Sequence, residues 1–415
     1  MTPPRTVEEH AETIARLVEP LLAGGTTERL PLAEAAGRVT AAAVRSDVDL
    51  PLFRNSQMDG YAVRSSDIRN VPVALEVSGD IPAGHTVPVI LTPGTALRIM
   101  TGAPVPSGAD TIVPVEDTDL VLGRDDDLRG AVVTIGRSRR PGEYVRERGS
   151  DLRRGDVLVE AGVRLAARHL AALAAAGVEA VEVRQLLRVG ILTTGAELVS
   201  AEKGSAERGT DGTPAGFGQV FDANGIALAA LVEESGAVVS VRTATSDDHD
   251  EFERALMDAV GASDLVVTSG GISKGAYEVV REVLQPHGAE VVTVAMQPGG
   301  PQATAVVAGV PVLSFPGNPV STQVSFTVFL RDLLRASAGL GAAGVETVQL
   351  AAELRSVVGK RQFLRGRRLP DGTVEQVAGP SSHLVAAMAR ADVLIDVPAE
   401  TEALAAGDDV TVWTL

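Results

Sequence analysis

Three glycine-rich turns, each preceded by an apolar run, contain the residues of this sequence best suited to bind an anion. They are 191–195 (ILTTG), 265–271 (LVVTSGG) and 312–319 (VLSFPGNP). A buried strand that ends in Thr, Ser or Gly and leads into a helix leaves backbone N–H groups pointing outward, where they attract phosphates and other oxyanions. Because the carboxyl ends of parallel strands lie along one edge of a sheet, we expect the three turns to line a single crevice for an anionic small molecule.

Acidic side chains close to these turns form a second group that can do chemistry. Glu197 follows the first turn by two residues, and Asp222 and the pair Asp247 and Asp248 precede predicted helices. A helix dipole explains Glu197 by itself, whereas Asp222 with Asn224, and Asp247 or Asp248, are suitable helix caps. Taken singly, each acid is at least as well explained by structure as by function.

Three polar segments stand in the first half of the chain. They are 55–63 (NSQMDGYAV), 98–104 (RIMTGAP) and 143–156 (EYVRERGSDLRRGD). The Asp59-Gly60 pair is by itself an ordinary turn. The third segment mixes acids with arginines, which is typical of a salt-bridged surface loop. None of the three predicts a site when it is considered alone.

Composition excludes several classes of function. A chain of 415 residues is too long for one ordinary core, so two to four domains are expected. The net charge of −17 argues against general nucleic-acid binding, and no apolar run is long enough to span a membrane. The absence of cysteine excludes thiol nucleophiles and thiolate metal sites, and the six histidines show no metal-ligand spacing. We expect a soluble, cytoplasmic protein with no nucleic-acid or membrane partner.

The elements that must position the turns are readable from the pattern of apolar residues. Thr6 and Glu9 match a capping box at the start of an amphipathic helix. From Asp47 to about Gly149, short β-prone runs broken by Pro and Gly predict an all-β domain, with the acidic 125–127 stretch as a hairpin loop. The runs are 71–77, 87–91, 97–99 and 111–115.

Strands and helices then alternate, which predicts a doubly wound, mostly parallel α/β domain. An Ala-rich helix over 166–176, ended by Gly177, precedes this region. Strands are predicted at 188–193, 238–243, 264–268, 290–295 and 311–314, and helices at 222–235, 250–260, 277–285 and 319–336. From about Gly341 the pattern returns to short strands, which predicts a small C-terminal β domain.

Taken together, the order and spacing of these pieces resemble the MoeA and gephyrin E-domain family of molybdenum insertases over nearly the whole chain. The NSxMDGYA and PGNPVS segments are highly specific in combination. The matching stretches are 55–63, 98–106, 142–156, 193–198, 222–225, 268–275, 315–321 and 381–383. The resemblance implies a molybdopterin molybdenumtransferase, which converts adenylylated molybdopterin and molybdate to molybdenum cofactor with release of AMP, dependent on a divalent cation.

The resemblance also implies a fold of four domains and an elongated homodimer. The predicted domains are 1–50 with 150–180 (N-terminal helix and linking domain), 51–149 (inserted β domain), 181–337 (α/β, molybdopterin-binding-like) and 338–415 (C-terminal β domain). The active cleft is expected between the α/β domain and the partner subunit's β domains. Contacts with the adenylyltransferase and with molybdoenzymes are expected from the same resemblance.

Motif position in the family assigns roles to particular residues. The catalytic polar set is Asp59, Thr101, Asp151, Glu197, Asp247 and Glu278. The substrate-binding set is Ser269, Gly270, Gly271, Ser273, Lys274, Pro316, Gly317, Asn318, Arg361, Arg365 and Ser382. Glu197, Asp247 and Asp248 are the expected Mg²⁺ ligands, since this hard ion prefers oxygen. An exposed basic strand explains the two arginines equally well.

One stretch departs from the family pattern. Where the family typically shows Lys-Pro-Gly-Lys-Pro, residues 297–301 read Gln-Pro-Gly-Gly-Pro, so both cationic side chains are missing. After the second glycine turn the family usually has two acids, and this chain has Ala276 and Glu278. Losing a cation opposite an oxyanion is costly unless another replaces it. Either Lys274 and nearby arginines compensate, or the pterin is bound with altered chemistry.

Two hypotheses of different class therefore follow. The first is an enzyme that inserts molybdate, or tungstate, into adenylylated molybdopterin. The alternative is a non-catalytic or altered paralogue that binds, stores or transfers molybdopterin or finished molybdenum cofactor. The altered 297–301 run favours the alternative, and the retained acids favour the enzyme, because a binding module has little need of them.

Overall fold

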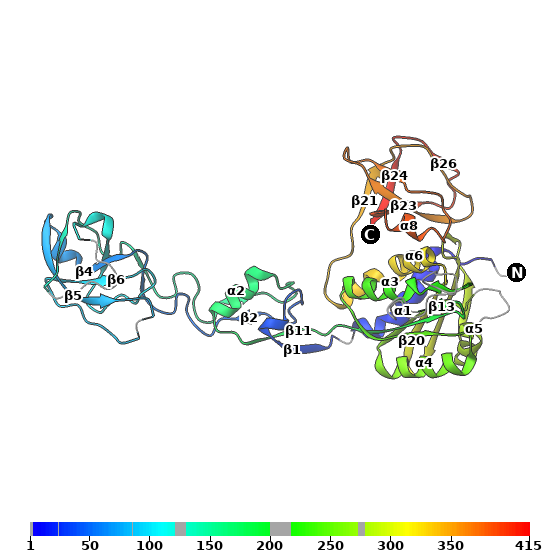
Figure 1. The fold of residues 1–415 in the computed structure, drawn as a ribbon, viewed down its shortest axis with the longest axis horizontal. Helices are drawn as coiled ribbons and strands as arrows, with labels where there is room; N and C mark the ends of the chain where they lie inside the picture. Colours follow the sequence, from blue (N-terminus) through cyan, green and yellow to red (C-terminus); the bar gives the residue numbers. More distant parts are fainter. Residues whose placement is uncertain (1–2, 24, 85, 121–129, 200–216, 273–278) are drawn as a thin grey trace. The chain divides into compact units, whose positions relative to one another are not determined.

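The computed structural model describes residues 3–23, 25–84, 86–120, 130–199, 217–272 and 279–415, in two compact units. The α/β unit comprises Met1–Glu28 and Val183–Leu415, and the β unit comprises Arg29–Glu182. In Figure 1 the β unit runs from dark blue through cyan to green, and the α/β unit holds the N-terminal helix and everything from green to red. The predicted boundaries of four domains stay a prediction.

A six-stranded mixed sheet forms the centre of the α/β unit. Its order is β15 (Val238–Thr245), β12 (Arg188–Thr194), β16 (Leu265–Ser269), β20 (Val310–Phe315), β19 (Pro301–Val307) and β17 (Glu290–Thr293). The first four strands are parallel to one another, β19 is antiparallel to β20, and β17 is antiparallel to β19, so β17 runs in the same direction as the first four. The predicted α/β fold with a mostly parallel sheet is confirmed.

Helices cover both faces of this sheet, as a doubly wound fold requires. On one face lie α1 (Val7–Ala23), α3 (Ala223–Glu234), α6 (Pro319–Phe329) and α7 (Arg331–Ser337), and on the other lie α4 (His249–Ala262) and α5 (Val279–Leu284). The alternation along β16 shows the reason. Leu265 and Val267 pack in the core under α1, α3, α6 and α7, and Val266 packs in the core under α4 and α5. Fully buried strands of this kind read as continuous apolar runs.

Strand β19 is the strand of the central sheet that sequence analysis missed. Its residues, PQATAVV, begin with proline and include glutamine and two alanines, which have weak β-propensity. The strand nevertheless pairs with β20 through a two-residue turn at Ala308 and Gly309, both with positive φ (48° and 87°). Turns with two positive φ values favour hairpins, so the Ala-Gly pair was the available indication.

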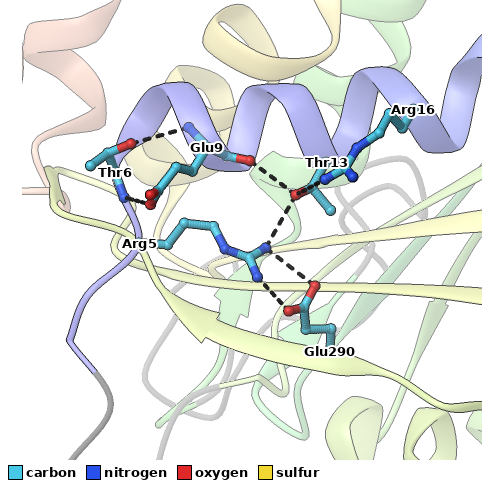
Figure 2. Close-up of polar contacts among 6 residues, drawn as sticks. All are labelled: Arg5, Thr6, Glu9, Thr13, Arg16 and Glu290. Atoms are coloured by element: carbon cyan, nitrogen blue, oxygen red, sulfur yellow. Dashed lines mark hydrogen bonds and ion pairs between the residues drawn. The ribbon is translucent and has the colours of Figure 1, made fainter.

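The start of α1 follows the predicted capping box and is tied to the sheet (Figure 2). The Thr6 N–H donates to Glu9 Oε2 at 2.9 Å, and the Glu9 N–H donates to Thr6 Oγ1 at 3.1 Å. Arg5 pairs with Glu290 of β17 and also donates to Thr13 Oγ1 at 3.4 Å. These contacts hold the helix that covers one face of the central sheet.

The C-terminal part of the α/β unit is a second sheet, which confirms the predicted C-terminal strands. Its order is β18 (Met296–Gln297), β23 (Arg361–Arg368), β25 (Val393–Val397), β27 (Asp409–Thr414) and β21 (Val345–Gln349), with β24 (Val374–Gln376) beside β23. A two-stranded sheet of β22 (Leu354–Arg355) and β26 (Ala403–Leu404) and the short helix α8 (Val385–Met388) complete this part. Strand β18 joins the altered 297–301 run to this sheet.

The β unit is built mainly of short strands. Its main sheet has the order β7 (Thr111–Pro114), β4 (Gly60–Val63), β6 (Thr95–Ile99), β5 (Val73–Ile81) and β8 (Val132–Ile135). Its other elements are β2 (Val44–Arg45), β3 (Asn55–Ser56), β9 (Val145–Arg146), β10 (Val157–Val159) and the helix α2 (Ala167–Ala175), and the unit boundaries fall within β1 (Thr27–Pro31) and β11 (Ala180–Arg184).

Two segments of this unit, 87–91 and 125–127, were predicted to be a strand and a hairpin loop. The predicted strand at 87–91 is wrong: this segment makes only an isolated bridge between Ile90 and Ser107, because prolines flank and interrupt it. The acidic 125–127 stretch lies outside the described residues. Within the described ranges of the whole chain, no helix has the length and apolar character needed to cross a membrane.

Candidate functional site

The three glycine turns meet around one pocket of about 730 Å³ in the α/β unit. Two further segments line the same pocket. One is the altered 297–301 run, which begins at the last residue of β18, and the other is the loop at 380–383, before α8. The lining residues are Thr194, Gly195, Glu197, Leu198, Asn224, Asp247, Gly270, Gly271, Ile272, Gln297, Pro298, Gly299, Pro301, Pro316, Gly317, Asn318, Ser321, Pro380, Ser381, Ser382 and His383. The expected crevice at the carboxyl edge of the parallel strands is present.

Glycine is required where the turns touch each other. Gly270 has a φ of 104°, and a Cβ there would lie 2.5 Å from the carbonyl oxygen of Thr194. A Cβ on Gly317 would lie 3.2 Å from the Cα of Gly270. Only residues without a side chain let the three turns approach this closely, so the glycines shape the pocket.

Asn224 links the second and third turns by hydrogen bonds. Its Nδ2 donates to Ser269 Oγ at 2.9 Å and to the Gly317 carbonyl at 2.7 Å. Asp222 caps α3 as predicted, accepting from the Gly225 N–H at 2.9 Å. The expectation that Asn224 is also a cap is wrong, because its side chain is turned toward the neighbouring turns.

Sequence analysis therefore missed Asn224 as a pocket residue. The side chain is 7% exposed, and its Oδ1 is buried without a hydrogen-bond partner. Its position in the first turn of α3, directly after a strand end, was the available indication, since parallel strands place such helix starts at one edge. Asp222 also accepts from Thr193 Oγ1 at 2.9 Å, which ties the first turn to α3.

Two of the three expected metal ligands line the pocket. Glu197 is exposed to it, and Asp247 accepts from Thr194 Oγ1 at 3.1 Å and from the Ala196 N–H at 3.2 Å. Asp248 instead caps α4 through the Glu251 N–H at 2.9 Å and does not line the pocket. A pair of carboxylates fits a hard divalent ion that keeps several waters.

A second group of potential metal ligands lies on α4. In the described parts of the chain, the cluster of three ligand-type side chains is His249, Asp250 and Glu253 on α4, all exposed. Exposed acidic groups of this kind are common without an ion. Glu197 and Asp247, in contrast, line the same pocket as the glycine turns.

The N-terminus of α6 opens into the same pocket. Asn318 stands at the cap position without a capping side-chain hydrogen bond, and Ser321 of the first turn lines the pocket at 3% exposure. The Val320 N–H donates to the Ser382 carbonyl at 3.2 Å, so the loop before α8 is anchored beside this helix end. The positive end of the helix dipole thus faces the space that an anion would occupy.

Neither predicted arginine lines the pocket. Arg361 pairs with Asp396 and with Glu8, and the hydrogen bond to Asp396 raises the pKa of Arg361 further. Arg365 is buried, donates to the carbonyls of Ser381 (3.1 Å) and Gly379, and has its pKa lowered by burial. Arg365 therefore supports the pocket loop from behind.

The remaining predicted residues of this region differ in their placement. Ser269, Gly270, Gly271, Pro316, Gly317, Asn318 and Ser382 lie at the pocket as expected, Ser269 through its bond to Asn224. Ser273, Lys274 and Glu278 lie outside the described residues. Gln297 lines the pocket, and its Oε1 accepts from Gln362 Nε2 at 2.7 Å.

Three predicted catalytic residues lie in the β unit. Thr101 donates to Asp59 Oδ1 from its N–H at 2.6 Å and from its hydroxyl at 2.7 Å. These hydrogen bonds lower the pKa of Asp59, so its carboxylate form is favoured. Asp151 is exposed on a bend, where its N–H donates to the Leu50 carbonyl at 3.0 Å. The structure thus joins Asp59 with Thr101, and in the described parts of the chain no hydrogen bond links Asp151 to either of them.

Comparison with known proteins extends over the whole chain. Three family models match: the MoeA N-terminal region (domain I and II) at 5–177, the probable molybdopterin binding domain at 190–336, and the MoeA C-terminal region (domain IV) at 347–415. A Mycobacterium tuberculosis protein named molybdopterin molybdenumtransferase 2 is 40% identical, covering 99% of this chain and 100% of its own.

Two further relatives agree with this match. A Nostoc protein named molybdopterin molybdenumtransferase is 35% identical over 100% of this chain and 94% of its own. The crystal structure of the molybdopterin biosynthesis MoeA protein from Pyrococcus horikosii is 30% identical, covers 97% of this chain and 98% of its own, and superposes with a TM-score of 0.74.

Proposed function

Because this chain belongs to the MoeA family and is a molybdopterin molybdenumtransferase of molybdenum cofactor biosynthesis, we propose that the pocket of its α/β unit binds adenylylated molybdopterin together with molybdate. One observation carries the proposal: three glycine turns, a helix N-terminus and a loop from the C-terminal sheet region line the same cavity. Such a cavity offers main-chain N–H groups to oxyanions from several sides.

The residues of the pocket suit different parts of this substrate. The turns at Gly270–Gly271 and Pro316–Asn318 would hold the pterin and its phosphate, with Ser321 and Ser382 adding hydroxyl groups beside the N-terminus of α6. Glu197 and Asp247 would hold Mg²⁺, which when bound polarises a phosphoanhydride oxygen. The supporting observation is that both carboxylates line the pocket and that carboxylate oxygen is the donor this ion prefers.

The proposed reaction balances without an oxidant or reductant. Water attacks the phosphoanhydride, its oxygen stays on phosphorus, and AMP leaves. The pterin groups that bind the metal give up two protons, and one oxide of molybdate takes these protons and leaves as water. The pterin groups replace this oxide on the metal, so no electrons are transferred. The protein's contribution is to orient the two anions and to offset their repulsion.

We propose that Asp59, Thr101 and Asp151 also take part in the reaction, and that the chain forms a homodimer. Contacts with the adenylyltransferase that supplies the substrate and with molybdoenzymes belong to the same proposal, as does a cytoplasmic location. Light scattering tests the dimer: the expected mass is twice the 42.9 kDa of the chain.

A direct assay tests the proposed activity. Purified protein is mixed with adenylylated molybdopterin, Mg²⁺ and molybdate, and AMP release is measured together with reconstitution of a molybdoenzyme. The expected result is that both appear and that both need molybdate. Tight pterin binding without either product would overturn the proposal and would indicate a binding or storage protein.

A further inference from the structure

The pocket that the proposed function assigns to two anions is lined by few positive groups. Its described lining residues include two acids, Glu197 and Asp247, and contain neither lysine nor arginine. Main-chain N–H groups and a divalent ion offset part of the repulsion between ligand and carboxylates, and a protonatable side chain at the rim would offset more.

The two arginines predicted to bind the substrate do not meet this need. Arg361 is engaged by Asp396 and Glu8, and both terminal nitrogens of Arg365 donate to main-chain carbonyls. Gln297, at the first altered position, is neutral and held by Gln362, and Gly300 has no side chain. Lys274 lies outside the described residues.

His383 is the protonatable nitrogen base among the described lining residues. It belongs to the loop before α8, whose backbone is anchored on two sides, by Val320 donating to Ser382 and by Arg365 donating to Ser381. The His383 carbonyl also accepts from the Val385 N–H at 2.9 Å, which fixes the backbone at this position. The imidazole itself is exposed, and within the described structure no hydrogen bond engages it.

We propose that protonated His383 binds the anionic part of the substrate in this pocket, and that it supplies positive charge where residues 297 and 300 do not. Its role is specificity and binding, and it rests on the proposed function. An imidazolium held on an anchored loop beside the N-terminus of α6 adds a charge-assisted hydrogen bond to the main-chain donors already there.

Binding through an imidazolium group depends on pH. Histidine is the side chain type whose charge ordinarily changes between pH 5 and 8, so a contact that needs the imidazolium form should strengthen as the pH falls. Among the described residues, the other titratable groups that line the pocket are Glu197 and Asp247, and Arg365 donates to the loop that carries His383. The phosphate of the ligand titrates in the same range, so the wild-type pH profile alone does not identify His383.

Variants separate these contributions. The dissociation constant for molybdopterin is measured by calorimetry at pH 6.0 and pH 8.5 for the wild type, His383→Gln and His383→Lys. We expect His383→Gln to weaken binding on the order of tenfold at pH 6.0 and little at pH 8.5. His383→Lys, charged at both pH values, should bind as tightly as the wild type at pH 6.0 and more tightly at pH 8.5.

A matched control is His287→Gln, which changes an exposed histidine that does not line the pocket; it should leave both constants unchanged. An equal loss in His383→Gln at both pH values, or a failure of lysine to restore binding, would overturn the inference. A failure of the proposed function can be told apart from a failure of this inference. In the first case the wild type would release no AMP, and that result does not depend on how the variants bind molybdopterin.

Discussion

Asn224 donates a 2.7 Å hydrogen bond to the carbonyl of Gly317, which lies 93 positions away along the chain. The same amide group also reaches Ser269, so one side chain joins two of the three turns that form the pocket. Because Gly317 has no side chain, its backbone can approach Gly270 closely enough for this bridge to form.

We predict that Asn224→Ala disrupts the pocket. The variant removes one hydrogen bond from the buried Ser269 Oγ and one from the carbonyl of the exposed residue Gly317, which should lower the free energy of unfolding by about 1–3 kcal/mol. Molybdopterin should bind at least several-fold more weakly. Thermal unfolding and calorimetric titration measure the two effects, with the exposed Asn70→Ala as control. Wild-type affinity in Asn224→Ala would show that the turns hold their positions without the bridge.

We predict that Gly270→Ala abolishes substrate binding. The new Cβ would lie 2.5 Å from the Thr194 carbonyl at a φ of 104°, so the second turn must move away from the first. Gly261→Ala, where a Cβ meets nothing within 4 Å in α4, is the control and should be neutral or slightly stabilising. Binding of molybdopterin by both variants checks the prediction. A Gly270→Ala protein that binds normally would contradict it.

We predict that Gln297→Lys tightens binding of the anionic substrate about fivefold at low salt. A partly exposed ammonium group in the pocket contributes on the order of 1 kcal/mol, and added salt should weaken it. Gln297→Met removes the same hydrogen bond to Gln362 without adding charge, so it isolates the effect of the cation. Titrations at two salt concentrations measure the difference. Equal affinity of the lysine and methionine variants at low salt would show that position 297 does not face the anion.

We predict that Asp247→Asn raises the Mg²⁺ concentration needed for half-maximal AMP release by about tenfold, because a neutral amide replaces a charged ligand. Asp248→Asn is the matched control: asparagine caps a helix as well as aspartate does, and this residue does not line the pocket. The Mg²⁺ dependence of AMP release tests both variants. A larger effect in Asp248→Asn would reverse the assignment of the ligand.

We predict that His10 makes the α/β unit less stable in acid. Burial, and after it the neighbouring Arg5 guanidinium, lowers the pKa of His10 from 6.5 to about 4. The unfolded chain therefore binds this proton at higher pH than the folded one, so stability falls as pH drops from about 6.5 toward 4. Between pH 7.5 and 5 the loss due to His10 is about 2 kcal/mol.

His10→Asn should show a smaller decrease in melting temperature over this range than the wild type. The control His287→Asn should show the same decrease as the wild type. The comparison must be made between pH values, because the His10 ring also packs edge-on against Phe329 with centroids 4.8 Å apart. Loss of that contact lowers stability at every pH. An identical pH dependence in His10→Asn and the wild type would refute the assignment.

Much of the fold was predictable because its determinants are local. The Thr6 and Glu9 capping box, the alternation of apolar strands with helices after residue 188, and the three glycine turns all depend on residues within a few positions of one another. Local rules failed at β19, whose pairing with β20 and β17 overrides its weak β-propensity.

The glycine turns, the family motifs that they carry and their place at one edge of a parallel sheet could all be inferred from residue order alone. The bridge that Asn224 makes between two turns, the different places of Asp247 and Asp248, and the hydrogen bonds of Arg365 to a pocket loop became visible only in the folded chain. A turn's backbone shape depends on neighbouring residues, which explains the first group. The partner of a buried amide, carboxylate or guanidinium is instead chosen by packing between segments far apart in the chain.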